Sequence, residues 1–148
     1  MAFAALSVVR SPGRALRPER ALELGFGQGF GLGLLAAANP HLTCEGYDFN
    51  PEHVAHAREL IKEAGLTNLN VPEASFEEVA LRGGDNNVDA IAAHGIISWV
   101  SPQAQDALVA IVRQRLQPNG LFYLSYNCMP GWAALQPIKQ FLLEGQAA

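Results

Sequence analysis

The fold of this chain is decided by the stretch Ala21-Leu22-Glu23-Leu24-Gly25-Phe26-Gly27-Gln28-Gly29-Phe30-Gly31. It contains a short apolar strand that ends on an acidic residue, then glycines at every second position, then the start of a helix. Glycine inside a strand or helix costs roughly 0.5–1 kcal/mol relative to alanine, so this spacing predicts a tight turn or a close approach of the backbone to another group. At a strand–loop–helix junction, that group is usually a nucleotide lying across the sheet.

Outward from this stretch, predicted strands and helices alternate along the chain. The strands are expected at 22–24, 42–47, 68–72, 88–93 and 121–126. The helices are expected at 30–38, 51–64, 76–81 and 102–116, with a turn at 118–120 and a last helical segment at 132–143 that Pro137 interrupts. This alternation predicts an α/β fold: a Rossmann-like, doubly wound sheet of about five parallel strands with helices on both faces.

Length and composition indicate one globular domain, expected at 21–148, preceded by an N-terminal segment at 1–20. Hydrophobic residues make up 49% of the 148, and the net charge of −4 argues against general nucleic-acid binding. No apolar run approaches the ~18–20 residues of a membrane span, so no membrane association is expected. The arginine-rich start faintly resembles an organelle transit peptide, but a short helix at 3–9 followed by a linker is the interpretation we favour, and hence a cytoplasmic protein.

Two common nucleotide-binding signatures do not fit the glycine run. The dinucleotide fingerprint G-x-G-x-x-G/A is matched only by Gly31-x-Gly33-x-x-Ala36, which lies inside the predicted helix, where a pyrophosphate cannot reach it. The P-loop signature is absent, and so is a Tyr-x-x-x-Lys pair. An NAD-type oxidoreductase is therefore disfavoured, and a nucleoside ligand without phosphates is indicated. Gly31 and Gly33 are expected to let the first helix lie close on the sheet.

Three motifs resemble the class I S-adenosylmethionine-dependent methyltransferases. An acid followed by alternating glycines stands at 23–29, Asp48 closes the second strand, and Ser75-Phe76 follows the third. The resemblance implies the strand order 3-2-1-4-5 and S-adenosyl-L-methionine as the cofactor. It also implies a C-terminal antiparallel hairpin, for which the 22 residues after Tyr126 leave too little room, so the hairpin is expected to be missing.

The resemblance implies cofactor contacts from the loops that follow the first four strands. Glu23 would anchor the methionine amino group, and Asp48 would accept both ribose hydroxyls in a charge-assisted bidentate contact. The adenine would meet Ser75, where the family often has Asp. The expected cofactor-binding residues are Glu23, Gly25, Gly27, Gly29, Asp48, Phe49, Ser75, Phe76 and His94. A tight turn is the structural alternative for the glycines, and a place in the core is the alternative for the two phenylalanines.

Two later blocks, 93–100 and 124–132, resemble one bacterial subgroup of these methyltransferases. In that subgroup a regulatory domain commonly follows, and some members methylate protein lysines. The expected acceptor is thus a protein side chain or a small molecule that the sequence does not identify. His94, as a base, and Tyr126 and Asn127, at the rim of the crevice, are the candidate catalytic residues. A module that binds the cofactor but transfers nothing, as a partner subunit, is the alternative.

The remaining expectations concern surfaces. Without the hairpin, strand five is a bare sheet edge, so either the chain is a truncated or minimal form or a second copy covers this edge in a homodimer. His53 and His56 lie three apart on a predicted helix; with no third ligand visible they are expected on a solvated face, and no metal site is predicted. Cys44 and Cys128 are expected to be buried free thiols.

Overall fold

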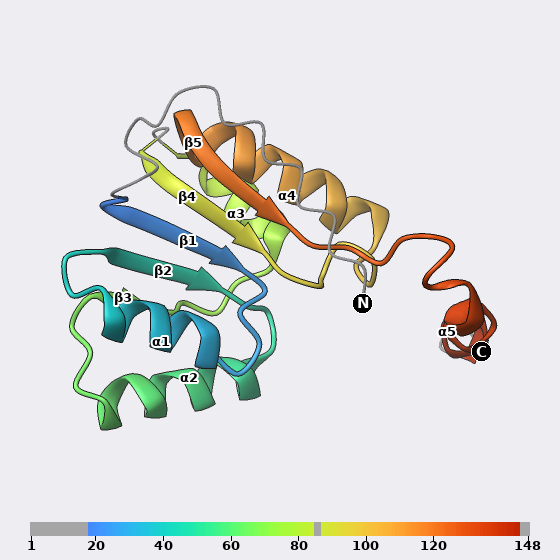
Figure 1. Ribbon diagram of the computed structural model, residues 1–148, viewed down its shortest axis with the longest axis horizontal. Coiled ribbons are helices and arrows are strands. Elements are labelled where there is room, and N and C mark those ends of the chain that lie inside the picture. Colours follow the sequence, from blue (N-terminus) through green and yellow to red (C-terminus); the bar gives the residue numbers. More distant parts are fainter. Residues whose placement is uncertain (1–17, 85–86, 146–148) are drawn as a thin grey trace.

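The computed structural model describes residues 18–84 and 87–145, which form a parallel α/β sheet with helices on both sides (Figure 1). Five parallel strands are ordered β3-β2-β1-β4-β5, as predicted. The strands are β1 (Arg20–Leu24), β2 (Thr43–Tyr47), β3 (Leu69–Asn70), β4 (Val88–Ala93) and β5 (Leu116–Leu124). The helices are α1 (Phe30–Ala38), α2 (Pro51–Glu63), α3 (Phe76–Arg82), α4 (Pro102–Arg115), the 3-10 turn η2 (Ala133–Leu135) and α5 (Gln136–Gly145).

Two apolar clusters lie on opposite faces of the sheet. Successive strand residues point to opposite faces, so Leu22 and Leu24 of β1 pack with α3 and α4, whereas Ala21 packs with α1 and α2. Cys44 lies in the second cluster, where burial, assisted by the charge of Glu23, raises the pKa of its thiol to about 11. Both cysteines are free, but Cys128 is only partly buried, contrary to expectation, because it follows β5 at the surface.

Strand β5 begins earlier than predicted and contains the predicted turn as an irregularity. Leu116 pairs with Val88 and Leu121 pairs with Ala90, so four residues of β5 lie opposite Asp89 alone. Within this insertion Pro118 cannot donate a ladder hydrogen bond, and Asn119 adopts a left-handed φ of 66°. The turn predicted at 118–120 is present as this irregularity. Because the residues before and after it both pair with β4, they belong to one strand.

The fold differs from expectation in two further places. Strand β3 has two residues rather than five, followed by an isolated bridge between Asp48 and Glu73. Pro137 does not interrupt the last helix but lies in the first turn of α5, where no N–H is needed. The helix predicted at 3–9 and its linker lie outside the described residues. No antiparallel strand follows β5 within residues 125–145.

The close approach between the first helix and the sheet is made by a different glycine from those predicted. A Cβ added to Gly31 or Gly33 would meet open space. A Cβ on Gly46 of β2 would instead lie 2.5 Å from Leu32 of α1 and 2.8 Å from Phe26. The expectation for Gly31 and Gly33 was therefore wrong: large apolar side chains from α1 reach the sheet, and the sheet supplies the glycine.

Within the part of the chain that the structure describes, no helix has the length and apolar character needed to cross a bilayer.

Candidate functional site

The loop from Gly25 to Gly29 joins β1 to α1 at the carboxyl edge of the sheet. Gly25, Gly27 and Gly29 have φ values of 72°, 58° and 82°, a left-handed conformation that side chains disfavour. A Cβ on Gly25 would lie 2.7 Å from Ile96, and a Cβ on Gly29 would lie 2.6 Å from the Cβ of Ala57, so both are tightly packed. A Cβ on Gly27 would meet nothing within 4 Å. The loop is thus open on the side of Gly27.

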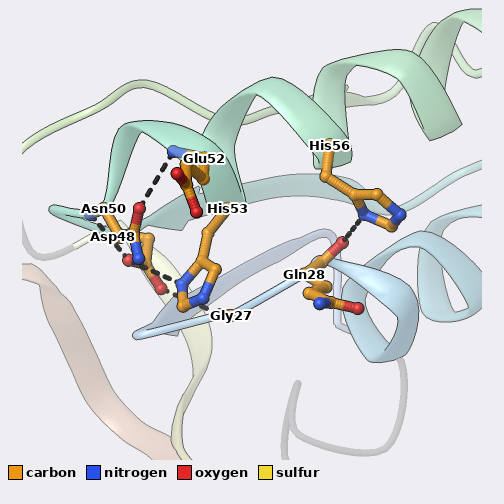
Figure 2. Close-up of polar contacts among 7 residues, drawn as sticks. All are labelled: Gly27, Gln28, Asp48, Asn50, Glu52, His53 and His56. Carbon is orange, nitrogen blue, oxygen red and sulfur yellow. Dashed lines mark hydrogen bonds and ion pairs between the residues drawn. The ribbon is translucent and has the colours of Figure 1, made fainter.

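Asp48, directly after β2, ties this loop to the start of α2. Its side chain is 7% exposed. Oδ2 accepts a hydrogen bond from the Gly27 N–H at 2.9 Å, and Oδ1 accepts one from the Asn50 N–H at 2.9 Å (Figure 2). Each carboxylate oxygen has two acceptor sites, and Oδ1 also lies 3.3 Å from His53 Nδ1, so one site on Oδ2 remains for a further donor such as a hydroxyl group.

His53 and His56 are partly exposed on α2, and the expectation of a solvated face did not include the contacts that both rings make. His53 Nδ1 lies 3.3 Å from Asp48 Oδ1, and His56 Nδ1 lies 2.9 Å from the carbonyl oxygen of Gln28 (Figure 2). The sequence offered one signal for this: α2 starts three residues after Asp48, so its first turns run beside the loop. Within the described residues, no three His, Cys, Asp or Glu side chains gather as a metal site.

An open pocket of about 340 Å³ lies beside Asp48, between the loops that follow β2 and β3. It is lined by Phe49, Glu73, Ala74, Ser75 and Glu78. Phe49 is 73% exposed, so its ring is available to a ligand. Ser75 Oγ accepts from the Glu78 N–H, and the Glu78 carboxylate accepts from the Ser75 N–H, which caps α3. Phe76 packs in the core with β1 and β4, behind this pocket.

Glu23 and His94 lie on neighbouring strands at the same edge. Burial raises the pKa of Glu23, and the charge of His94 acts in the opposite sense. His94 Nδ1 lies 3.2 Å from the Tyr123 hydroxyl and 3.0 Å from Ser125 Oγ, and its ring stacks on Tyr123. Sequence reasoning missed Tyr123 and Ser125, although their alternate spacing along β5 and its extension was a signal that both face His94.

The segment after β5 forms the far side of this edge. Tyr126 is 51% exposed, and the Asn127 N–H donates to Ser98 Oγ at 2.9 Å. Trp132 packs edge-on against Trp99 with ring centroids 5.8 Å apart. In addition, Lys139 of α5 donates to the Ser98 carbonyl at 2.5 Å, which connects α5 to the loop after β4. Tyr126 and Asn127 follow Ser125, which contacts His94, and their part in an acceptor site stays a prediction.

The fold and the site together are those of an α/β protein that binds a ligand at the carboxyl edge of a parallel sheet. The loops after β1, β2 and β4 converge at the carboxyl edge of a parallel sheet, and the strand order reverses between β1 and β4. Ligands of open α/β sheets bind at this switch point. The N-cap of α1 is Gly29, with no side-chain hydrogen bond, so the first N–H groups of α1 are available to a negatively charged or polar group.

Comparison with known proteins then gives the family. The chain belongs to the methyltransferase domain family, whose model matches residues 21–120. Its fold is that of class I S-adenosylmethionine-dependent methyltransferases. A solved structure of PKMT2 from Rickettsia typhi in complex with AdoHcy is similar over 84% of this chain and 24% of that one, with 28% identity and a TM-score of 0.74.

Two sequence relatives complete the comparison. An uncharacterized protein of Synechocystis is 39% identical over 121 residues, which is 82% of this chain and 24% of the relative. A tRNA (guanine-N(7)-)-methyltransferase of Pseudomonas putida is 28% identical over 136 residues, which is 87% of this chain and 54% of the relative. The chain thus spans between about a quarter and about half the length of these relatives. PKMT2 and the tRNA (guanine-N(7)-)-methyltransferase are both 28% identical to this chain, so identity alone does not assign an acceptor.

Proposed function

We propose that this chain is the catalytic domain of an S-adenosyl-L-methionine-dependent methyltransferase. The observation that carries the proposal is the contact between Asp48 and the Gly27 N–H. It fixes a left-handed glycine loop whose outer side is open, next to a carboxylate with remaining acceptor capacity and a pocket with an exposed aromatic ring. These features match the three chemical parts of the cofactor: an amino acid, a ribose and an adenine.

We assign the cofactor contacts as follows. The carboxylate of its methionine part would meet the open N–H groups at the start of α1 near Gly29, and its amino group would meet Glu23. One ribose hydroxyl would donate to the remaining acceptor site on Asp48 Oδ2, and the adenine would enter the pocket beside Phe49 and Ser75. Gly25 and Phe76 would support these contacts from behind, and His94 would lie near the methionine part.

The chemistry needs little from the protein beyond positioning. When bound, S-adenosylmethionine supplies a methyl group on a sulfonium, which is already an activated leaving group. The chain would hold donor and acceptor in line, and near-attack geometry can account for most of the rate. A base is needed only if the nucleophile arrives protonated. His94 is the candidate base, held through Nδ1 by Tyr123 and Ser125, with Tyr126 and Asn127 shaping the acceptor side.

For the acceptor we propose a protein side chain, with a lysine favoured, and a small molecule as the second class. Two features support this choice: the blocks at 93–100 and 124–132 that resemble the bacterial subgroup, and the similarity to PKMT2. The exposed aromatic residue Tyr126 suits an alkylammonium side chain, whereas the Trp99 ring already has the Lys139 ammonium 5.4 Å from its centroid.

A transfer assay tests this function. The protein is incubated with methyl-labelled S-adenosylmethionine and a panel of lysine-rich proteins, lysine derivatives and tRNA. We expect label in a lysine-containing acceptor and none with Asp48→Ala, which removes the loop contact and the ribose acceptor. Cofactor binding without transfer to any acceptor would identify a binding module instead of an enzyme.

We also propose a cytoplasmic location, as expected from the sequence, and a homodimer across the β5 edge. The supporting observation for the dimer is that Leu121 and Tyr123 on this edge strand are 49% and 39% exposed. Sedimentation of wild type and Leu121→Lys tests it. A wild type that is monomeric at micromolar concentration contradicts the dimer.

A further inference from the structure

Helix α2 contacts the glycine loop at two points and Asp48 at a third. His53 reaches Asp48, and His56 reaches the carbonyl oxygen of Gln28 (Figure 2). Ala57 packs directly against Gly29. The His56 ring also lies against Phe30, with centroids 5.2 Å apart. The loop is therefore held from α2 as well as from β2.

The chemistry of the partners determines which ring nitrogens carry hydrogen. A carbonyl oxygen and a carboxylate oxygen can only accept hydrogen bonds. His56 must therefore donate its Nδ1–H to Gln28, and His53 must donate its Nδ1–H to Asp48. Both neutral and protonated imidazole can carry this hydrogen, so both contacts can form in either state.

These contacts fix two peptide groups and leave the one between them open. In the Phe26–Gly27 peptide, the N–H donates to Asp48 and the carbonyl accepts from the Gly29 N–H at 3.1 Å. In the Gln28–Gly29 peptide, that same Gly29 N–H is used and the carbonyl accepts from His56. The Gly27–Gln28 peptide makes no hydrogen bond within the described residues, and Gly27 faces open space.

We propose that His53 and His56 are positioning residues that hold the two flanking peptides so that the Gly27–Gln28 peptide is presented to the methionine part of S-adenosylmethionine. His56 acts on the carbonyl side, and His53 acts through Asp48 on the N–H side. This inference rests on the proposed function, because it names the ligand of the same loop. It assigns a task to two residues that touch neither the cofactor nor the acceptor.

The test uses two amides that differ in reach. The amide nitrogen of asparagine is two bonds from Cβ, as Nδ1 of histidine is, whereas that of glutamine is three bonds away. Binding of S-adenosylhomocysteine is measured by calorimetry for wild type, His56→Asn and His56→Gln, and for the same pair at position 53. Exposed His41 supplies the control His41→Ala. The melting temperature of each unliganded variant is recorded alongside.

We expect the Asn variants to bind within about twofold of wild type and the Gln variants to bind about five- to tenfold more weakly, because the ligand must then order loop peptides that the histidine no longer holds. The Gln variants should also melt at a lower temperature, since they lose a contact present in the unliganded protein. Binding is measured well below every melting temperature, where a purely structural role would lower the melting temperature and leave the affinity unchanged. Equal affinities for Asn and Gln, or Gln affinities equal to that of His41→Ala, would overturn the proposal. Failure of wild type to bind would instead refute the proposed function.

Discussion

Glu23 and Asp48 are carboxylates at the same edge of the sheet, but their surroundings give them different tasks. Asp48 is satisfied by backbone N–H groups of two segments, so it organises the loop. Glu23 is buried more than it is compensated, and burial therefore raises its pKa. A partly buried carboxylate whose pKa is raised by burial is typical of a site that binds a cationic group, such as the amino group of a ligand.

The raised pKa of Glu23 predicts a stability cost at neutral pH. The folded state holds the proton more tightly than the unfolded chain, so stability falls as pH rises from the ordinary value of 4.5 through the folded pKa. Glu23→Gln should therefore melt at a higher temperature than wild type at about pH 8, with a smaller difference at about pH 4. It should also bind S-adenosylhomocysteine more weakly. Thermal melts at the two pH values check this, and a less stable Gln variant at the higher pH would contradict it.

At the scale of elements, the loop between β1 and α1 depends on glycines for different reasons at different positions. Gly29 has a left-handed φ and lies against α2, whereas Gly33 lies inside α1 with nothing near its missing side chain. In the sequence both belong to one alternating series of glycines. In the structure, Gly29 allows the loop and α2 to touch, whereas Gly33 makes no such contact and only lowers the stability of α1.

This difference predicts opposite effects of the same substitution. Gly29→Ala should lower the free energy of unfolding by about 2–4 kcal/mol, because the new methyl group meets Ala57 and the φ is strained. Gly33→Ala should raise it by about 0.5–1 kcal/mol. Urea denaturation of both variants measures the two changes. Similar effects of the two substitutions would refute this account of the loop.

At the scale of the whole molecule, the carboxyl ends and the amino ends of the strands have separate roles. At the amino ends, opposite the site, buried Asp89 accepts hydrogen bonds from the backbone N–H groups of Glu19 and Arg20 and from Gln117. It thereby joins the starts of β1, β4 and β5. Nothing in this arrangement faces the glycine loop, so the stability of the sheet and the binding of a ligand should be separable.

Asp89→Ala tests that separation. The variant leaves the partly buried N–H donors of Glu19, Arg20 and Gln117 unpaired, so the free energy of unfolding should fall by about 1–3 kcal/mol. Its affinity for S-adenosylhomocysteine at a temperature where it remains folded should stay within about twofold of wild type. Denaturation and calorimetry on the same sample give both values. A loss of affinity comparable to that of Asp48→Ala would show that the two ends of the strands are coupled.

The sheet could be predicted from sequence more fully than the site. Apolar runs, proline and glycine placed β4 and α2 accurately, because these signals are local. The task of His56 could not be predicted, since its partner is a carbonyl 28 residues away and carbonyls leave no mark in a sequence. For the same reason Phe76 was not distinguishable from Phe49: one is buried behind the pocket and the other lines it.

The central claim, that this edge of the sheet holds S-adenosylmethionine, is tested most directly by calorimetric titration of the wild-type protein. S-adenosylmethionine, S-adenosylhomocysteine and NAD are titrated in separate runs. The account predicts one-to-one binding of both sulfur ligands, loss of that binding in Asp48→Ala, and no binding of NAD. Absence of binding by either sulfur ligand at high micromolar concentration, or binding of NAD in their place, would contradict it.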